Sequence, residues 1–118
     1  MKGLGATVKV CPNVPSKDME NDVNQAYTLA KKDETGVLFD QFENPANFLA
    51  HFDGTGPEIW EQAGQKVDAF VAAAGTGGTL AGISSFLKSK DKDVKVYLAD
   101  PQSSNLFDYI CKDAASAQ

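Results

Sequence analysis

Apolar and polar positions follow two periods along this chain, one typical of strands and one typical of helices. Residues 67–72 form a short apolar run closed by glycines, too brief for a helix, which favours a buried strand. In the next segment Leu80, Ile83 and Leu87 recur at helical spacing and form one apolar face. Residues 94–99 return to the strand pattern. The second half of the chain is therefore predicted to fold as strand, helix, strand.

The first half repeats this order. Alternation over residues 5–10 predicts a strand. Ser16 is placed to cap a helix that presents Val23 and Tyr27 on one face. Residues 37–41 predict a second short strand. A strand, a helix and a strand within about thirty-five residues are typical of a parallel sheet with a helical crossover, so the fold class predicted is α/β.

Two helices are predicted between these halves. Asn44 and Pro45 start the first, because Asn accepts an unpaired N–H and proline loses nothing at the first helical position. Residues 54–57 should stop that helix and start a second one, which ends at Gly64. A further helix is expected over residues 106–110, before a frayed end. The side chains expected in the core are Phe48, Leu49, Phe52, Ile59, Trp60, Ala63 and, on the last strand, Tyr97.

A glycine-rich turn, here called the glycine loop, joins the strand at 67–72 to the helix after it. The C-terminal end of a strand and the N-terminus of a helix meet there, so backbone N–H groups are unpaired and point outward. An anion can accept these hydrogen bonds and is attracted by the helix dipole, so the expected ligand is a phosphate. The glycine loop comprises Gly75, Thr76, Gly77, Gly78 and Thr79.

The spacing of the loop disfavours two common nucleotide motifs. The dinucleotide fingerprint would have its third glycine where Leu80 stands, and Asp100 is the only acidic residue near the ribose-binding position. A nucleoside-triphosphate loop would need a lysine after Gly82, where this chain has Ile83. A site for a single phosphate group remains.

The residues around this loop carry a family resemblance. The Gly-Thr-Gly-Gly-Thr sequence at 75–79 resembles the phosphate loop of the pyridoxal-phosphate enzymes of the cysteine synthase and cystathionine β-synthase family. Asn-Pro-Ala-Asn at 44–47 with His51, and Thr-Gly-Pro-Glu-Ile-Trp at 55–60, resemble the sequence upstream of that loop. Gln41 stands where the family has a glutamine. Three motifs in matching order are specific, whereas the glycine loop alone is not.

Two further stretches extend the resemblance to residues 2–107. Residues 2–8 are similar to the family's Leu-Gly-Ala strand, and Leu-Ala-Asp-Pro at 98–101 resembles the fungal cysteine-synthase-like branch. The resemblance implies an incomplete parallel-sheet, three-layer segment of a fold type II enzyme. Residues 1–41 would close its smaller N-terminal domain, and residues 42–118 would open the larger C-terminal domain that carries the glycine loop.

The resemblance also implies a chemistry. In such an enzyme, pyridoxal 5'-phosphate enables sulfide to replace the activated oxygen group of a serine, which makes cysteine. The N–H groups of residues 76–79 and the hydroxyls of Thr76 and Thr79 would hold the cofactor phosphate. Gln41 would contact the carboxylate of the amino-acid substrate. The complete enzyme is expected to be a homodimer.

Motifs that the chemistry needs are missing from this chain. The family's lysine, which bonds to the cofactor aldehyde, and its Ser/Thr-Gly-Asn loop both precede the region that matches, and neither motif occurs here. The residue that holds the ring nitrogen would follow position 118. We therefore expect an internal fragment with no catalytic residue of its own, inactive alone. Cut from its sheet neighbours, it should be marginally stable or associate with other chains.

Composition limits the possible partners. The chain has 118 residues, 42% of them hydrophobic, which suits one domain with a modest core. Its basic residues are all lysine, 11 against 16 acidic residues, and the net charge of −5 argues against a nucleic-acid surface. No apolar run is long enough to span a membrane, and a strand expected near the start leaves no room for a targeting segment. An intracellular location is expected, cytoplasmic or mitochondrial.

The metal-ligating residue types are few. Cys11 and Cys111 are far apart in sequence and are expected to be reduced thiols rather than a disulfide. With one histidine and no Cys-x-x-Cys pair, no metal site is predicted. His51 is interpreted as a helix-face or packing residue rather than a catalyst.

Three functional hypotheses remain open. The first is a segment of a cysteine synthase, although a reaction of serine with homocysteine, or a deamination, stays possible within it. The second is a non-catalytic relative of the same descent that binds a phosphorylated ligand or a partner. The third is an unrelated nucleotide-binding α/β module. At the loop itself, Thr76 and Thr79 could cap the helix, contact the phosphate, or do both.

Overall fold

The computed structural model of the 118-residue chain describes residues 1–102, 104 and 106. The chain divides into two compact units, Met1–Asp40 and Gln41–Gln118, here called unit 1 and unit 2. The helix expected over residues 106–110 lies outside the described residues except for Leu106, and so does the expected frayed end. The division of the complete enzyme into domains at residues 41 and 42 stays a prediction.

Unit 1 consists of two helices without a strand. A short 3-10 helix, η1, spans Lys2–Leu4, and one α-helix, α1, spans Asp22–Lys32. The strands predicted at 5–10 and 37–41 are both wrong, since the sheet among the described residues contains neither segment. A strand depends on hydrogen bonds to a neighbouring strand, and none of residues 1–40 is buried.

Helix α1 begins later than its sequence pattern indicates. Its N-cap is Asn21 rather than Ser16, and the Asn21 Oδ1 accepts the Val23 N–H at 3.1 Å. The Asn24 amide donates to the backbone carbonyl of Ser16 at 2.7 Å and holds the preceding segment in turns. The prediction of Ser16 as cap is therefore wrong, because Asn21, an equally favourable capping residue further along the chain, begins the helix.

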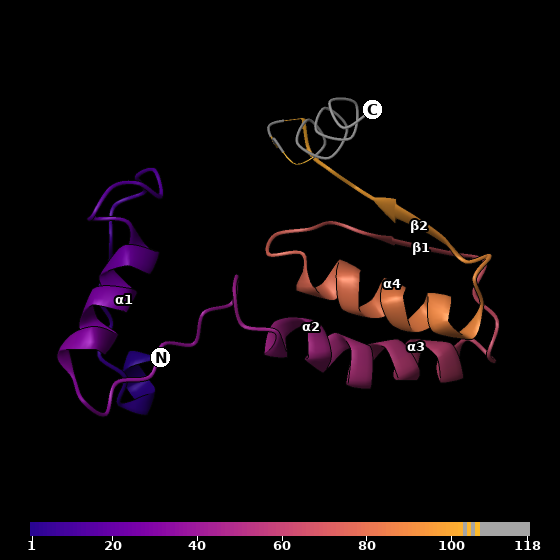
Figure 1. The fold of residues 1–118 in the computed structure, drawn as a ribbon, viewed down its shortest axis with the longest axis horizontal. Helices are drawn as coiled ribbons and strands as arrows, with labels where there is room; N and C mark the ends of the chain where they lie inside the picture. The colour runs from indigo at the N-terminus through magenta and orange to yellow at the C-terminus, as the bar shows by residue number, and fades with distance from the viewer. Residues whose placement is uncertain (103, 105, 107–118) are drawn as a thin grey trace. The chain divides into compact units, whose positions relative to one another are not determined.

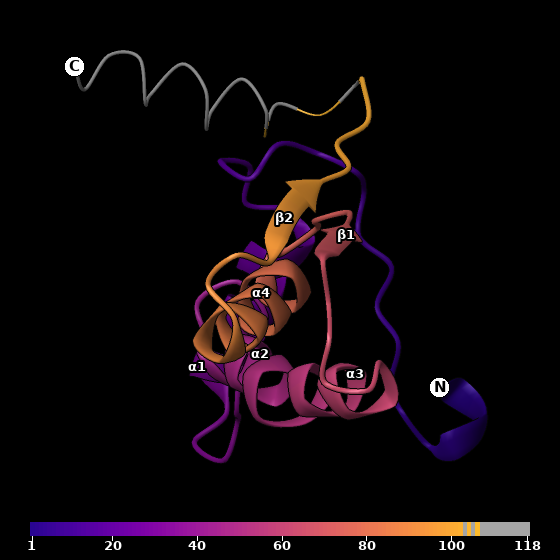
Figure 2. The same ribbon diagram turned by 90° about the vertical axis from the view of Figure 1, so that its right-hand side faces the viewer.

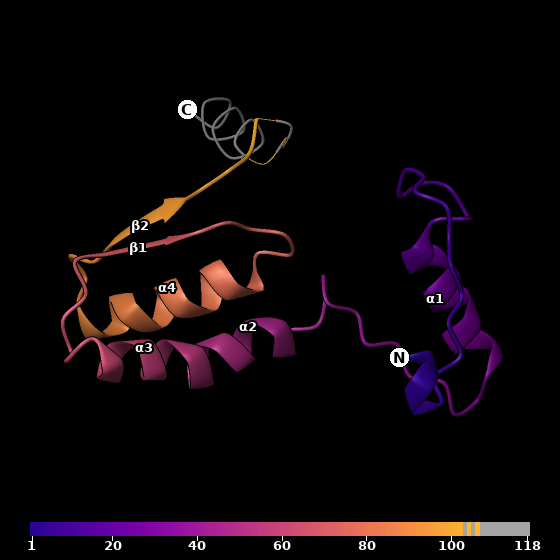
Figure 3. The same cartoon turned by 180° about the vertical axis from the view of Figure 1, so that it is seen from behind.

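Unit 2 is built in layers. Helix α4 lies between the two strands and the layer formed by α2, η2 and α3 (Figure 1), and the same order is visible from other directions (Figure 2 and Figure 3). The elements in chain order are α2 (Ala46–Ala50), the π-helical turn η2 (His51–Thr55), α3 (Gly56–Gln62), β1 (Ala69–Ala72), α4 (Gly78–Lys90) and β2 (Lys95–Leu98).

The two strands pair in parallel and α4 is their crossover helix. Ala69 is in register with Lys95, and Ala72 with Leu98. The strand, helix, strand prediction for the second half is confirmed, with strand ends that differ by one or two residues. The α/β class is confirmed as well. A single βαβ unit is only part of such a sheet, which agrees with an incomplete fold.

The second helix predicted to start within residues 54–57 is confirmed, since α3 begins at Gly56. The break predicted before it is wrong, because the chain stays helical from α2 into α3. The Gly56 N–H donates to the His51 carbonyl, which is the wider spacing of a π turn. Pro57 has no N–H, so the carbonyl of Asp53 cannot have its usual α-helical partner. The wider turn falls at this point and takes the place of a break. The start of the layer is as predicted, since Asn44 Oδ1 accepts the Ala46 N–H at 2.9 Å.

The core of unit 2 forms where α4 meets the strands and α3. Ile83, Leu87 and Val94 are 2%, 0% and 1% exposed, and Trp60 packs against them as predicted. Tyr97, Leu49 and Ala63 were also expected in the core, but Tyr97 is 52% and Leu49 45% exposed and Ala63 is exposed as well, so these three expectations are wrong. Helix α4 covers one face of the sheet, and Tyr97 and its register partner Val71 alternate onto the other face.

Glycines allow α4 to approach the α2–η2–α3 layer closely. A Cβ at position 82 would lie 2.5 Å from the Phe48 carbonyl oxygen and 2.7 Å from the His51 Cβ. A Cβ at position 56 would lie 2.8 Å from the Phe86 Cβ. Backbone and Cβ atoms cannot move away without shifting a helix. The spacing between these helices therefore depends on glycine.

We predict that Gly82→Ala destabilises unit 2 by about 1–3 kcal/mol through overpacking. The control is Gly54→Ala in η2, where an added Cβ meets nothing within 4 Å, so its effect should stay within about 1 kcal/mol. Urea unfolding followed by the fluorescence of Trp60, the single tryptophan, measures both. Equal stabilities of the two variants would contradict the close packing.

Candidate functional site

The glycine loop forms the N-terminus of α4, as its sequence indicates. Gly77 is the N-cap with φ +87°, a left-handed conformation that favours glycine. No side chain caps the helix, so of the two roles left open for Thr76 and Thr79, capping is wrong and contact with the phosphate stays a prediction. The first N–H groups of an α-helix have no intrahelical acceptor. The N–H groups at the start of α4 are therefore available to an external acceptor.

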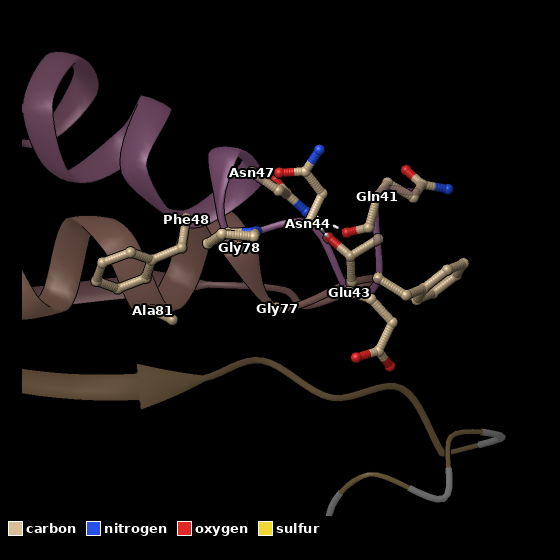
Figure 4. Close-up of a pocket in the computed structure, with 11 residues that line it drawn as sticks. Gln41, Glu43, Asn44, Asn47, Phe48, Gly77, Gly78 and Ala81 are labelled. Carbon is tan, nitrogen blue, oxygen red and sulfur yellow. Dashed lines mark hydrogen bonds between the residues drawn. The ribbon is translucent and has the colours of Figure 1, made fainter. Parts of the chain in front are cut away.

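A cavity of about 260 Å³ opens at this end of α4. Among the residues predicted to form the site, Gln41, Thr76, Gly77 and Gly78 line it, whereas Gly75 and Thr79 do not. Figure 4 shows Gln41 and Glu43 toward one end of the cavity and Phe48 with Ala81 toward the other. The remaining lining residues are Phe42, Asn44, Pro45 and Asn47.

Asn47 holds the walls of this cavity together. Its Nδ2 donates to the Gln41 carbonyl at 2.8 Å and to the Thr76 Oγ1 at 2.7 Å. Its side chain also packs against Gly78, where it leaves no room for a Cβ. One amide thus connects the segment before α2, α2 itself and the glycine loop. Sequence reasoning missed this role, and the only signal for it was the place of Asn47 in the motif at 44–47.

His51 lies behind the loop with both ring nitrogens in hydrogen bonds. Its Nε2 is 3.0 Å from the Thr79 Oγ1, and its Nδ1 is 3.0 Å from the Thr55 Oγ1. The ring is half-buried, and its Cβ lies against Gly82. The packing role predicted for His51 is confirmed, and the contact with Thr79 is an addition that the sequence did not predict.

Among the charged side chains of the described residues, Glu43 lines this cavity. In unit 1, hydrogen bonds from the Thr35 hydroxyl and N–H hold the pKa of the Asp33 carboxyl below its ordinary value. In the part of the chain that the structure describes, no three His, Cys, Asp or Glu side chains are grouped to hold a metal ion. Cys11 is a free thiol, but Cys111 lies outside the described residues, so the reduced pair stays a prediction.

The helices were also compared with the length and apolar character of a membrane span. Over the described residues, no helix combines the length and the apolar character that crossing a bilayer requires.

Comparison with known proteins identifies the family. Residues 1–117 match the family described as "Pyridoxal-phosphate dependent enzyme". The chain belongs to this family. Cysteine synthase 2 of Schizosaccharomyces pombe is 50% identical over 111 residues, which cover 88% of this chain and 28% of the relative. A putative mitochondrial cysteine synthase of Saccharomyces cerevisiae is 43% identical over 117 residues, covering 93% and 30%. Cystathionine beta-synthase of Apis mellifera is 40% identical over 104 residues, covering 87% and 21%.

These matches settle the family resemblance seen in the sequence. Membership of the cysteine synthase and cystathionine β-synthase family is confirmed, and with it pyridoxal phosphate as the family's cofactor. An unrelated nucleotide-binding module is excluded. The chain spans less than a third of the length of these relatives. The reaction of the whole protein is therefore a matter for proposal.

We predict that Asn47→Ala loosens the glycine loop, because two hydrogen bonds are lost, each worth about 0.5–1.5 kcal/mol. The Ala81 N–H, which donates to the Gly77 carbonyl at 2.9 Å, should exchange with solvent about 5–150 times faster, since 1.4 kcal/mol corresponds to about a tenfold change. Hydrogen exchange followed by NMR measures this rate.

The matched control is Asn24→Ala in unit 1, which also removes two hydrogen bonds donated by one amide, in this case both to backbone carbonyls. That variant should leave the exchange of Ala81 unchanged. An Asn47→Ala chain with wild-type exchange at Ala81 would show that Asn47 does not hold the loop.

Proposed function

We propose that this chain forms the phosphate site of a pyridoxal-phosphate-dependent cysteine synthase, which replaces the activated oxygen group of a serine by sulfide. The observation that carries the proposal is the uncapped N-terminus of α4, with Gly77 in a left-handed conformation beside a cavity. Family membership and the names of the relatives agree with it.

The geometry of the loop supports a specific set of proposed phosphate contacts. The N–H groups of residues 76–79 and the hydroxyls of Thr76 and Thr79 are the proposed donors. A Cβ at Gly75 or Gly77 would meet nothing within 4 Å, so the loop leaves open space on its outer side. The positive end of the α4 dipole stabilises a dianion at this position.

Gln41 is the proposed contact for the substrate carboxylate. Its exposed side chain and the glycine loop border the same cavity, and Asn47 fixes its backbone carbonyl. An amide group donates readily to a carboxylate. A residue so placed can orient an amino acid relative to a cofactor whose phosphate is bound at α4.

The bound cofactor supplies an electron sink for the α-carbon of the substrate. The lysine that this chemistry requires is proposed to come from another segment of a longer protein. Every lysine in the described part of the chain is exposed, and none of these lysines lines the cavity. We therefore expect this chain alone to bind the phosphate without turnover.

The oligomeric state, the substrate class and the location of the complete enzyme are proposed from its relatives. We expect a homodimer that acts on a small amino-acid substrate, inside the cell, in the cytoplasm or in mitochondria. The name of the Saccharomyces cerevisiae relative supports the mitochondrial alternative. A non-catalytic relative of the same descent is the competing proposal, and it predicts phosphate binding without turnover even when the missing segments are supplied.

Pyridoxine 5'-phosphate tests the phosphate site directly, because it carries the phosphate but no aldehyde that could react with lysines. Titration into the 15N-labelled chain should shift the amide signals of residues 76–80 in a saturable way. Pyridoxine without the phosphate should leave these signals unchanged. Shifts spread over the exposed lysines, or no saturation, would overturn the proposed site.

We predict that Gly77→Val weakens the affinity for pyridoxine 5'-phosphate at least about tenfold. The side chain strains a left-handed residue and displaces N–H donors, each worth about 1 kcal/mol or more toward a charged acceptor. Gly5→Val is the matched control, because Gly5 has φ +86° and equal open space in unit 1. Equal affinity of Gly77→Val and wild type would refute the assignment of this loop.

A further inference from the structure

His51 joins two threonine hydroxyls that come from different elements. Thr55 is the last residue of η2, and Thr79 lies in the first turn of α4. Both hydroxyl oxygens are 3.0 Å from a ring nitrogen, Thr55 from Nδ1 and Thr79 from Nε2. The three side chains therefore form one continuous hydrogen-bonded row that ends at the glycine loop.

The protons of this row can be ordered in two ways. A neutral imidazole has one nitrogen that donates and one that accepts. In the first order the Thr55 hydroxyl donates to Nδ1, and Nε2–H donates to the Thr79 oxygen, which leaves the Thr79 proton free. In the second order the Thr79 hydroxyl donates to Nε2, and Nδ1–H donates to Thr55. Only the first order gives Thr79 a proton to donate elsewhere.

We propose that His51 is a positioning residue that makes Thr79 a hydrogen-bond donor to a phosphoryl oxygen at the start of α4. This inference rests on the proposed function, since it needs an anion at that site. A phosphate oxygen only accepts hydrogen bonds, so binding selects the first order, in which every donor points toward the anion. Each bond in such a row also strengthens the next by polarisation.

The packing of unit 2 holds this row in place. Gly82 lets α4 approach so closely that a Cβ there would lie 2.7 Å from the His51 Cβ. The Cβ from which the His51 ring extends is therefore packed directly against the helix that carries Thr79. Thr55 at the end of the π turn occupies the other nitrogen, which prevents Nδ1 from competing for a different donor. Thr55 is the distant end of the row and would not touch the ligand.

The tautomer of the ring tests the inference in the unmodified chain. His51 is the only histidine, so its ring-nitrogen NMR signals are unambiguous. They are recorded with and without saturating pyridoxine 5'-phosphate, at a pH at which they report a neutral ring in the free chain. A protonated Nε2 with an unprotonated Nδ1 in the bound state is the expected result. A protonated Nδ1 in the bound state overturns the inference.

Substitution of Thr55 provides a second readout. Thr55→Val keeps the shape but removes the hydroxyl that donates to Nδ1 in the first order. The row then loses one of the hydrogen bonds that support Thr79 as a donor, so the binding of pyridoxine 5'-phosphate should weaken about 3–10-fold. Thr55→Ser should restore the affinity. Thr28→Val in unit 1, whose hydroxyl donates to the Asn24 carbonyl, should have no effect. A purely structural role for residue 55 predicts wild-type affinity for the valine variant, and that result also overturns the inference.

The two proposals fail in different ways. If the wild-type chain shows no saturable shifts at residues 76–80, the phosphate site itself is wrong and the role of His51 is lost with it. If the wild type binds, but the tautomer in the bound state is the opposite one or Thr55→Val binds normally, only the role of His51 is wrong.

Discussion

The close approach of α4 to the α2–η2–α3 layer is the constraint on which the site depends. Gly78 and Gly82 leave no room for side chains where they face Asn47 and Phe48. Only at this distance can the Asn47 amide reach Thr76. Any side chain at these two glycines would separate the helices and move the loop away from the residues that hold it.

How far the sequence predicts this structure depends on the range of the interactions. The glycine loop, α4 and both strands of unit 2 are encoded by local periodicity and by glycines, and the sequence predicts them correctly. Predictions failed where the outcome depends on distant partners. The strands expected in unit 1 have no neighbouring strand among its residues, and Tyr97 lies on the face of the sheet opposite α4 and is 52% exposed. The π turn at His51–Thr55 was not predicted for a different reason, because the glycines and Pro57 at this point indicate a break in the helix.

The site shows the same division. The residues proposed to bind the phosphate form one continuous segment, so their pattern is visible in the sequence. Asn47 reaches the loop from a separate helix, and His51 reaches Thr79 in the same way. Such contacts exist only after the helices pack, and the sequence offers no signal for them beyond a shared family motif. The residues that shape the loop are therefore harder to predict than those that form it.

The assignment of the glycine loop as the phosphate site is tested most directly by NMR. The measurement is the scalar coupling across hydrogen bonds between the 31P nucleus of bound pyridoxine 5'-phosphate and backbone amides. Such couplings identify each N–H that donates to the phosphate. We expect them for amides within residues 76–79, at the start of α4. Saturable binding with couplings absent from these amides and present elsewhere in the chain would contradict the assignment of the glycine loop as the phosphate site.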